Sequence, residues 1–358
     1  KIGHVFLIVL ENESYAKTFG DGSPAPYLAK TLVGQGARLD QYYGIGHNSL
    51  DNYIAMISGQ APNPATQEDC QNYTEFAYGG LGADGQALGR GCVYPASIKT
   101  LADQLAASGL SWKGYMEDLG AKSGRQTAAC GGHPAIGAQD TTQHAATGDQ
   151  YAMRHDPFAY FHSVLDTPDC TAHIVPLTAL EADLADAART PSFSFITPNL
   201  CHDGHDHKGP QQLCVGENSP GGLVAIDGFL KRWVPAIMGS PAFKADGLLV
   251  VTFDEAETPV EDSADSDSTS CCGEAADLNI HPGDAVFGVP DTGPGVNGPG
   301  GGRIGAVLLS PFILPGTVSE QPYNHYSLLR TIEDIFGLAP LGYAGPAHAF
   351  GADVFNRK

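Results

Sequence analysis

Acidic and amide side chains follow directly on two apolar runs of the chain, a pattern that can bind cations. Glu11 and Asn12 follow the run HVFLIVL, and Asp254 and Glu255 follow the run GLLVVTF. If these runs are neighbouring strands, three carboxylates and an amide meet at one end of a sheet, where their repulsion is costly unless a cation binds them. Oxygen ligands favour a hard cation such as Mg²⁺, Ca²⁺ or Mn²⁺. The alternative is that the pairs are helix caps or solvated loops.

Ser49 stands where a glycine-rich turn meets an apolar helical pattern, in the run GIGHNSLDNYIAMISG. Serine at a helix start is a favoured cap. The position also suits a nucleophile, because the N–H groups and dipole of a helix start stabilise a phosphate on the hydroxyl. A divalent ion on the hydroxyl would lower its pKa. We therefore expect Ser49 to be both a metal ligand and the nucleophile.

Three histidines and two aspartates crowd into six positions after a third apolar run, in FITPNLCHDGHDHKG. This segment holds Asp203, His205 and His207, which could bind a second ion or protonate a leaving oxygen. A polar surface loop is the alternative. His325 stands just before the last helical pattern, where a cap or a packed histidine is the alternative to a catalytic role.

Short apolar runs alternate with helical patterns along the chain, which is typical of βαβ units. The expected strands are 4–10, 192–197, 247–253 and 303–309, and the expected helices are 97–108, 178–188, 222–237 and 326–337. The alternation predicts an α/β fold, a three-layer αβα sandwich with a mostly parallel central sheet. We expect one catalytic domain over residues 1–358, with loop-rich insertions at 60–96 and 120–170 that cover the site like caps.

The charge balance restricts the partners of the chain. It has 19 Lys and Arg against 40 Asp and Glu, a net charge of -21, so its exterior repels nucleic acid and anionic membranes, and an anionic substrate needs a local cation. No apolar run is long enough to span a membrane. Eight scattered cysteines without a CxxC pair favour disulfides. The first residue is Lys1 and not Met. Together with the expected disulfides, this leads us to expect a secreted monomer, extracellular or periplasmic, whose signal peptide is already removed.

With these motifs in place, the chain resembles the bacterial phosphoesterase family that includes acid phosphatases and non-haemolytic phospholipases C, within the alkaline phosphatase superfamily. Six segments carry the resemblance in the expected order: HVFLIVLENESY, HNSLDNYIAMISG, SWKGYMEDL, FITPNLCHDGHD, VVTFDEAE and NHYSLLRTIEDIFGL. They span nearly the whole chain, and the insertions between them are not covered.

The resemblance implies an alkaline-phosphatase-like fold and phosphate transfer through a phosphoserine. It implies one divalent ion, or two, with Mg, Ca, Mn and Zn not distinguished, and a first metal site of Glu11, Asn12, Ser49, Asp254 and Glu255.

Other positions take their roles from the same resemblance. Asn52 matches a Ser-x-x-Asn pattern and would contact a phosphate oxygen. Asp203, His205 and His325 fall where superfamily members hold a second metal or leaving-group histidines, and His207 is an alternative to His205. The chain departs from the family at Asp51, where many relatives have proline.

The expected activity is hydrolysis of small phosphate monoesters, as in acid phosphatases. Phospholipase C-type cleavage of phospholipid headgroups is the alternative substrate class. A sulfatase is disfavoured because the Cys-x-Pro-x-Arg motif is absent, and a serine esterase because no GxSxG motif surrounds a serine. The non-enzymatic alternative is a secreted, calcium-stabilised binding protein with Asp262, Asp265 and Asp267 as ligands, although their loop lacks the EF-hand spacing.

Overall fold

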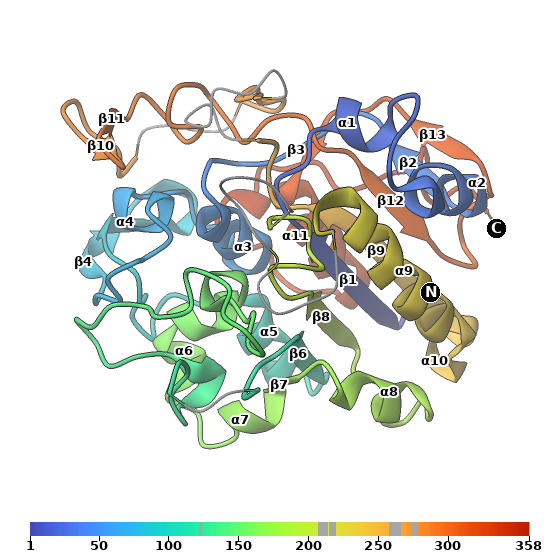
Figure 1. The fold of residues 1–358 in the computed structure, drawn as a ribbon, viewed down its shortest axis with the longest axis horizontal. Helices are drawn as coiled ribbons and strands as arrows, with labels where there is room; N and C mark the ends of the chain where they lie inside the picture. Colours follow the sequence, from blue (N-terminus) through green and yellow to red (C-terminus); the bar gives the residue numbers. More distant parts are fainter. Residues whose placement is uncertain (122–123, 207–213, 215–219, 258–265, 274–277, 358) are drawn as a thin grey trace.

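A sheet of eight strands forms the centre of the molecule (Figure 1). The structure is a computed structural model that describes residues 1–121, 124–206, 214, 220–257, 266–273 and 278–357. The strand order across the sheet is β13-β2-β12-β9-β1-β8-β6-β7. The strands are β1 (His4–Leu10), β2 (Ala37–Leu39), β6 (Trp112–Met116), β7 (Ile174–Pro176), β8 (Phe193–Thr197), β9 (Gly247–Phe253), β12 (Ala306–Leu309) and β13 (Thr317–Ser319).

The strand β1 lies in the middle of the sheet, paired in parallel with β8 and with β9. All of β9 and all but the first residue of β1 are buried, which explains their continuous apolar sequences. Their register places Leu10 opposite Phe253, so the chain leaves both strands at the same point. Among the eight strands only β12 is reversed. The predicted mostly parallel α/β sheet is confirmed.

Helices cover both faces of the sheet (Figure 1). On one side α3, α5 and α11 pack together, and on the other α9 and α10 lie against β1 and β9. The helices are α1 (Tyr15–Phe19), a π-helix (Tyr27–Leu32), α2 (Val33–Gln35), α3 (Ser49–Ser58), α4 (Pro64–Gln67), α5 (Leu101–Ala107), α6 (His162–Leu165), α7 (Cys170–His173), α8 (Ala179–Leu184), α9 (Gly222–Gly239), α10 (Pro241–Asp246) and α11 (His325–Phe336). Within the described part of the chain, no helix has both the length and the apolar character needed to cross a membrane.

In the described part of the chain, three small strand pairs lie outside the main sheet. They are β3 (Tyr42–Tyr43) with β14 (Tyr323–Asn324), β4 (Ala77–Leu81) with β5 (Ala87–Arg90), and β10 (Ala285–Val286) with β11 (Val289–Pro290).

Disulfides join all eight cysteines, as the sequence predicted. One bridge lies within each of the two long irregular segments, and another joins adjacent residues. The four bridges are Cys70–Cys92, Cys130–Cys170, Cys201–Cys214 and Cys271–Cys272. They restrict segments that hold little regular structure. The assignment of 60–96 and 120–170 as caps of a single domain stays a prediction.

Candidate active site

The ends of the neighbouring strands β1 and β9 bring Glu11, Asn12 and Asp254 together. The Asn12 backbone N–H donates to Asp254 Oδ1 at 3.2 Å. A terminal atom of the Asn12 amide also lies 3.2 Å from Glu11 Oε2 and from Asp254 Oδ1. Asn12 has a left-handed φ of 46°, which asparagine tolerates better than most residues. The sequence-predicted cluster of oxygen atoms therefore exists at this end of the sheet.

Helix α3 directs the Ser49 hydroxyl at this cluster. Ser49 is the first residue of α3, and its Oγ donates to Glu11 Oε2 at 2.7 Å. Tyr53, one turn later on the same helix face, donates to Glu11 Oε1. All three side chains are buried. One carboxylate thus orients a serine hydroxyl beside Asn12 and Asp254.

Glu255, the fourth residue predicted at the strand ends, contacts a histidine with one of its two carboxylate oxygens. Its Oε2 contacts His47 Nδ1, and His47 Nε2 donates to the Asp267 carbonyl at 2.9 Å. Burial lowers the pKa of His47 to about 4. The carboxylate oxygens of Asp267, a calcium ligand in the non-enzymatic alternative, accept from the N–H groups of Thr269 and Arg303. Asp262 and Asp265 lie outside the described residues.

Asn52 and His325 hold the surroundings of the site in place. The Asn52 amide accepts from two N–H groups and donates to two carbonyls of residues 45–48, the turn before the serine. His325 Nε2 donates to the Asp254 carbonyl at 2.5 Å, and its Nδ1 accepts from Tyr42 at 3.0 Å. Burial lowers the pKa of His325 to about 4. Both side chains thus have their polar atoms engaged by the protein.

The histidine-rich segment places Asp203 in the site and His205 at its rim. Asp203 is fully buried, and its Oδ1 accepts from the His205 backbone N–H at 2.8 Å. His205 is partly exposed and lines a cavity of about 310 Å³ together with Asn12 and Lys17. His207 lies outside the described residues. Of the oxygen cluster, Asn12 lines this cavity.

Arg154 and His155 belong to the site, although the sequence analysis did not find them. His155 Nε2 lies 3.3 Å from Glu11 Oε1, and His155 Nδ1 lies 3.3 Å from Asp203 Oδ2. Arg154 is also buried, with Nη2 3.4 Å from His205 Nε2. The available signal was the charged triplet RHD inside the apolar run YAMRHDPFAYF. Since no strand precedes this triplet, the pattern of polar side chains after strand ends does not include it.

The site holds several buried carboxyl groups close to one another. Burial, followed by the like charges of neighbouring carboxylates, raises the pKa values of Glu11 and Asp203 well above normal. Burial also raises the pKa of Asp254 to about 6. Burial and then the Arg154 charge lower the pKa of His155. For Arg154 itself, burial lowers the pKa, but the nearby carboxylates outweigh it and the pKa rises.

The donor atoms at this end of the sheet fit a divalent cation. Ligand atoms of Glu11, His155 and Asp203 lie within 4.8 Å of one another. Within the described part of the chain, several buried atoms have no hydrogen-bond partner, which is costly unless an ion binds them. These atoms are His155 Nε2, Asp203 Oδ2, Asp254 Oδ2 and Glu255 Oε1. Carboxylate, imidazole and amide groups together suit Mg²⁺, Mn²⁺, Ca²⁺ or Zn²⁺.

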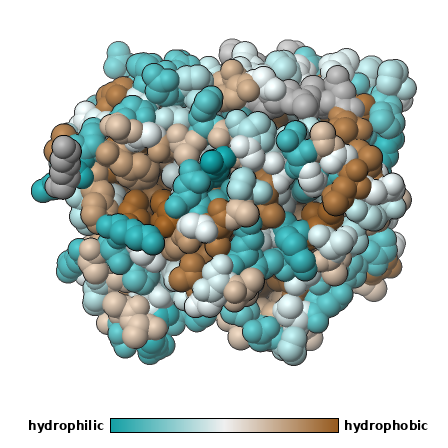
Figure 2. All heavy atoms as spheres, turned by 180° about the vertical axis from the view of Figure 1, so that it is seen from behind, coloured by the Kyte–Doolittle hydropathy of each residue, from teal (hydrophilic) through white to brown (hydrophobic). Residues whose placement is uncertain are grey.

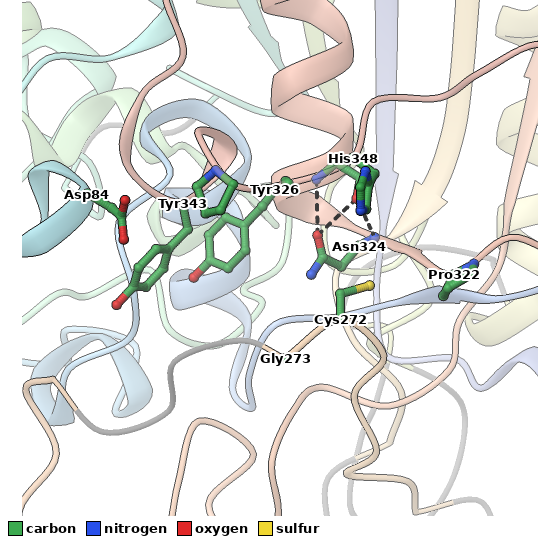
Figure 3. Close-up of a pocket in the computed structure, with 11 residues that line it drawn as sticks. Asp84, Cys272, Gly273, Pro322, Asn324, Tyr326, Tyr343 and His348 are labelled. Atoms are coloured by element: carbon green, nitrogen blue, oxygen red, sulfur yellow. Dashed lines mark hydrogen bonds between the residues drawn. The ribbon is translucent and has the colours of Figure 1, made fainter.

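A second cavity, of about 240 Å³, lies beside the start of α11 (Figure 3). Tyr326 and Tyr343 form part of its wall, with ring centroids 5.5 Å apart, and Cys272 and Asp84 border it. Asn324 caps the helix there by accepting from the Ser327 N–H at 3.0 Å. None of the lining residues is a sequence-predicted site residue, so this cavity is separate from the oxygen cluster.

Comparisons with known proteins find phosphatases among those that this chain is similar to. The profile of the phosphoesterase family matches residues 23–339. An acid phosphatase of Aspergillus fumigatus is 23% identical over 337 residues, which cover 94% of this chain and 55% of that protein. A phosphatidylinositol-3-phosphatase of Mycobacterium tuberculosis is 25% identical over 341 residues, which cover 95% of this chain and 79% of that protein. The solved structure of a Vibrio parahaemolyticus protein in the alkaline phosphatase superfamily superposes with a TM-score of 0.51 at 14% identity. The match covers 99% of this chain and 72% of that one, and it shows that the two share a fold.

Proposed function

This chain belongs to the phosphoesterase family, and from that premise we propose that it hydrolyses phosphate monoesters with Ser49 as the nucleophile. The observation that carries the proposal is the Ser49 hydroxyl, buried and held 2.7 Å from Glu11 at the end of the sheet. The relatives named as acid phosphatases support the same activity. Because the chain spans only 55% and 59% of the lengths of two of them, the activity is argued from the site itself.

Hydrolysis takes two displacements at phosphorus. Ser49 Oγ passes its proton to Glu11 Oε2 and bonds to phosphorus, while the bond from phosphorus to the alcohol oxygen breaks and that oxygen takes a proton from His205. Water then attacks the phosphoserine and gives a proton to His205. The bond between Ser49 and phosphorus breaks, Ser49 Oγ takes its proton back from Glu11, and inorganic phosphate leaves. Glu11 orients the hydroxyl for the first displacement.

The proposal includes one or two divalent cations in the site. When bound, such an ion lowers the pKa of the serine hydroxyl and neutralises charge on the phosphoryl oxygens. The residues that would hold the first ion are Glu11, Asn12, Ser49, Asp254 and Glu255. The residues that would hold a second ion are Glu11, His155 and Asp203. His207, which the sequence predicts as a metal ligand, would add to them.

Arg154 and His205 are proposed to act on the substrate directly. Arg154 Nη1 donates to the Gln143 carbonyl at 2.8 Å, while its buried Nε has no hydrogen-bond partner among the described residues. A guanidinium in this state can bind phosphoryl oxygens. His205, at the mouth of the cavity, would protonate the leaving oxygen. Asn52 and His325 are proposed as positioning residues.

Soluble monoesters are the proposed substrates, with lipid-borne phosphates as the alternative. A net charge of -21 opposes docking on anionic lipid. On the face shown in Figure 2, hydrophobic residues lie in separate patches among hydrophilic ones. The Mycobacterium tuberculosis relative is named for a phosphoinositide, which makes that lipid the first alternative to test. Rates on a soluble monoester, a diester and phosphoinositide or phosphatidylcholine vesicles separate these classes.

Several properties of the whole chain belong to the same proposal. The four disulfides support action in an oxidising compartment outside the cytosol. Arg154 and His155 both come from the segment 120–170, which supports the view that this segment covers the site within one catalytic domain. We propose that the chain acts as a monomer.

The Ser49→Ala substitution tests the proposed nucleophile. We expect no measurable turnover of p-nitrophenyl phosphate and an intact fold, because only one hydroxyl is lost. Ser58→Ala is the matched control, since Ser58 is a buried serine of the same helix whose hydroxyl bonds to the Ile54 carbonyl. The control should keep its activity. Turnover by Ser49→Ala near the parent rate would rule out the mechanism.

A further inference from the structure

A group of buried oxygen atoms outside the proposed phosphate site has too few hydrogen-bond donors. Asp51 is only 1% exposed, and neither of its carboxylate oxygens has a hydrogen-bond partner among the described residues. Gln67 is fully buried, and its Oε1 has none either. Buried oxygen atoms without a donor are costly unless a cation binds them.

Asp51 and Gln67 meet at the loop that follows β11. Asp51 Oδ2 and the Pro294 carbonyl oxygen both lie 2.6 Å from where a Cβ atom on Gly46 would stand. The Gln67 amide nitrogen approaches the same carbonyl at 3.4 Å, and it also faces the Gly293 carbonyl at 3.1 Å and Asp291 Oδ1 at 3.4 Å. The Gln67 amide thus contacts three oxygen atoms of the segment 291–294. The Pro294 carbonyl also accepts from the His47 N–H, and Asp291 Oδ1 also accepts from the Gly293 N–H.

The surrounding charges increase the need for a cation. The carboxylates of Asp69, Asp254 and Asp291 all lie close enough to act on Asp51 by like-charge repulsion. Asp291 is also more than nine-tenths buried. Carboxylate, amide and backbone carbonyl oxygens together form the ligand set that Ca²⁺ prefers.

This group is distinct from the site at Ser49. Residues two apart on an α-helix point about 200° away from each other, so Asp51 and Ser49 leave α3 on different sides. Ser49 donates to Glu11, whereas Asp51 packs against Gly46 and the loop at Pro294.

We propose that Asp51, Gln67 and Asp291, with the Pro294 carbonyl, bind a Ca²⁺ ion that is separate from the ions of the phosphate site. The ion links the first turn of α3 to the end of α4 and to the loop after β11, elements that lie on the same side of the molecule (Figure 1). It thereby fixes the helix start that carries the nucleophile.

The experiment compares Ca²⁺ binding by the parent chain and Asp51→Asn. Each protein is freed of metal with a chelator and titrated with Ca²⁺ while bound Ca²⁺ and melting temperature are measured. We expect Asp51→Asn to bind one equivalent less. At a hundredfold excess over Kd, Ca²⁺ should raise the melting temperature of the parent by about 5 °C more than that of the variant. Equal stoichiometry and equal shifts in the two proteins would overturn the proposal.

Three further variants keep the result interpretable. Asp227→Asn removes a buried carboxylate that already has partners in Lys231 and in the N–H groups of Tyr27 and Leu28, and should bind Ca²⁺ like the parent. Glu11→Gln should lose phosphatase activity but keep the Ca²⁺ equivalent that Asp51→Asn loses. This result would separate the two sites. If Asp51→Asn does not fold, Asp291→Asn takes its place and should lose the same Ca²⁺ equivalent. An Asp291→Asn protein that still binds this Ca²⁺ ion would overturn the proposal.

Discussion

Arg154 is the residue whose removal should most clearly separate binding of phosphate from chemistry at the serine. Its guanidinium is buried among Glu11, Asp69 and Asp203, all of which act on its charge. We expect Arg154→Gln to lower kcat/KM for p-nitrophenyl phosphate by about 10²-fold, the cost of removing one preorganised donor. Arg154→Lys should recover part of the loss because it restores the charge without the forked geometry.

The control for this prediction measures inhibition by inorganic phosphate. Loss of a phosphate-binding group raises the inhibition constant in step with KM, whereas a purely structural loss lowers the melting temperature and leaves that constant unchanged. Arg154→Gln with a parent-like inhibition constant would contradict the assigned role.

At the residue scale, the sequence predicted the side chains that follow strands and missed those that do not. Glu11, Asn12 and Asp254 could be predicted because parallel strands end at one edge of a sheet. His155 comes from a short turn in an irregular segment, where no periodic pattern shows which way a side chain points. The pairing of Glu255 with His47 could not be predicted either, because these residues lie 208 positions apart in the sequence.

At the element scale, α11 contains a buried acid that makes stability depend on pH. Burial raises the pKa of Glu333 to about 8. Its Oε1 accepts from the Leu341 N–H at 2.8 Å, and its Oε2 is buried without a hydrogen-bond partner in the described chain. Between pH 4.5 and about 8 the folded state therefore holds a proton that the unfolded state has lost.

The sign of the effect follows from this difference in bound protons. The free energy of unfolding should fall as the pH rises through this window, by up to about 1.4 kcal/mol per pH unit from this group. Glu333→Gln keeps the acceptor for Leu341 and should have a flatter pH profile in denaturant titrations. The exposed Glu181 of α8 offers a control, because Glu181→Gln should leave the slope unchanged. Parallel profiles for the parent and Glu333→Gln would exclude this contribution.

Long periodic elements could be predicted from the sequence, and short ones could not. The predicted strand 247–253 matches β9, and α11 begins within one residue of its predicted start. The three-residue strands β2, β7 and β13 are too short to show alternation, and β6 is interrupted by Lys113 and Gly114. Their place in the sheet is fixed by tertiary pairing.

At the scale of the whole molecule, removal of metal should affect both activity and stability. Several buried carboxylates repel one another at the strand ends, so the metal-free protein should melt at a lower temperature than the metal-bound one. Treatment with a chelator followed by dialysis should abolish hydrolysis of p-nitrophenyl phosphate. Addition of Mg²⁺, Mn²⁺, Ca²⁺ or Zn²⁺, one at a time, should restore it. Full activity with less than about a tenth of an equivalent of bound metal would contradict a metal-dependent mechanism.

The position of β1 has a consequence for how the chain is made. Of the strands in this sheet it leaves the ribosome first, yet its two partners, β8 and β9, begin about 190 and 240 residues later. Until then both edges of an apolar strand are open to other chains, and such an edge is prone to aggregate. A chaperone that shields nascent HVFLIVL should therefore increase the yield of folded protein more than one that acts after synthesis is complete.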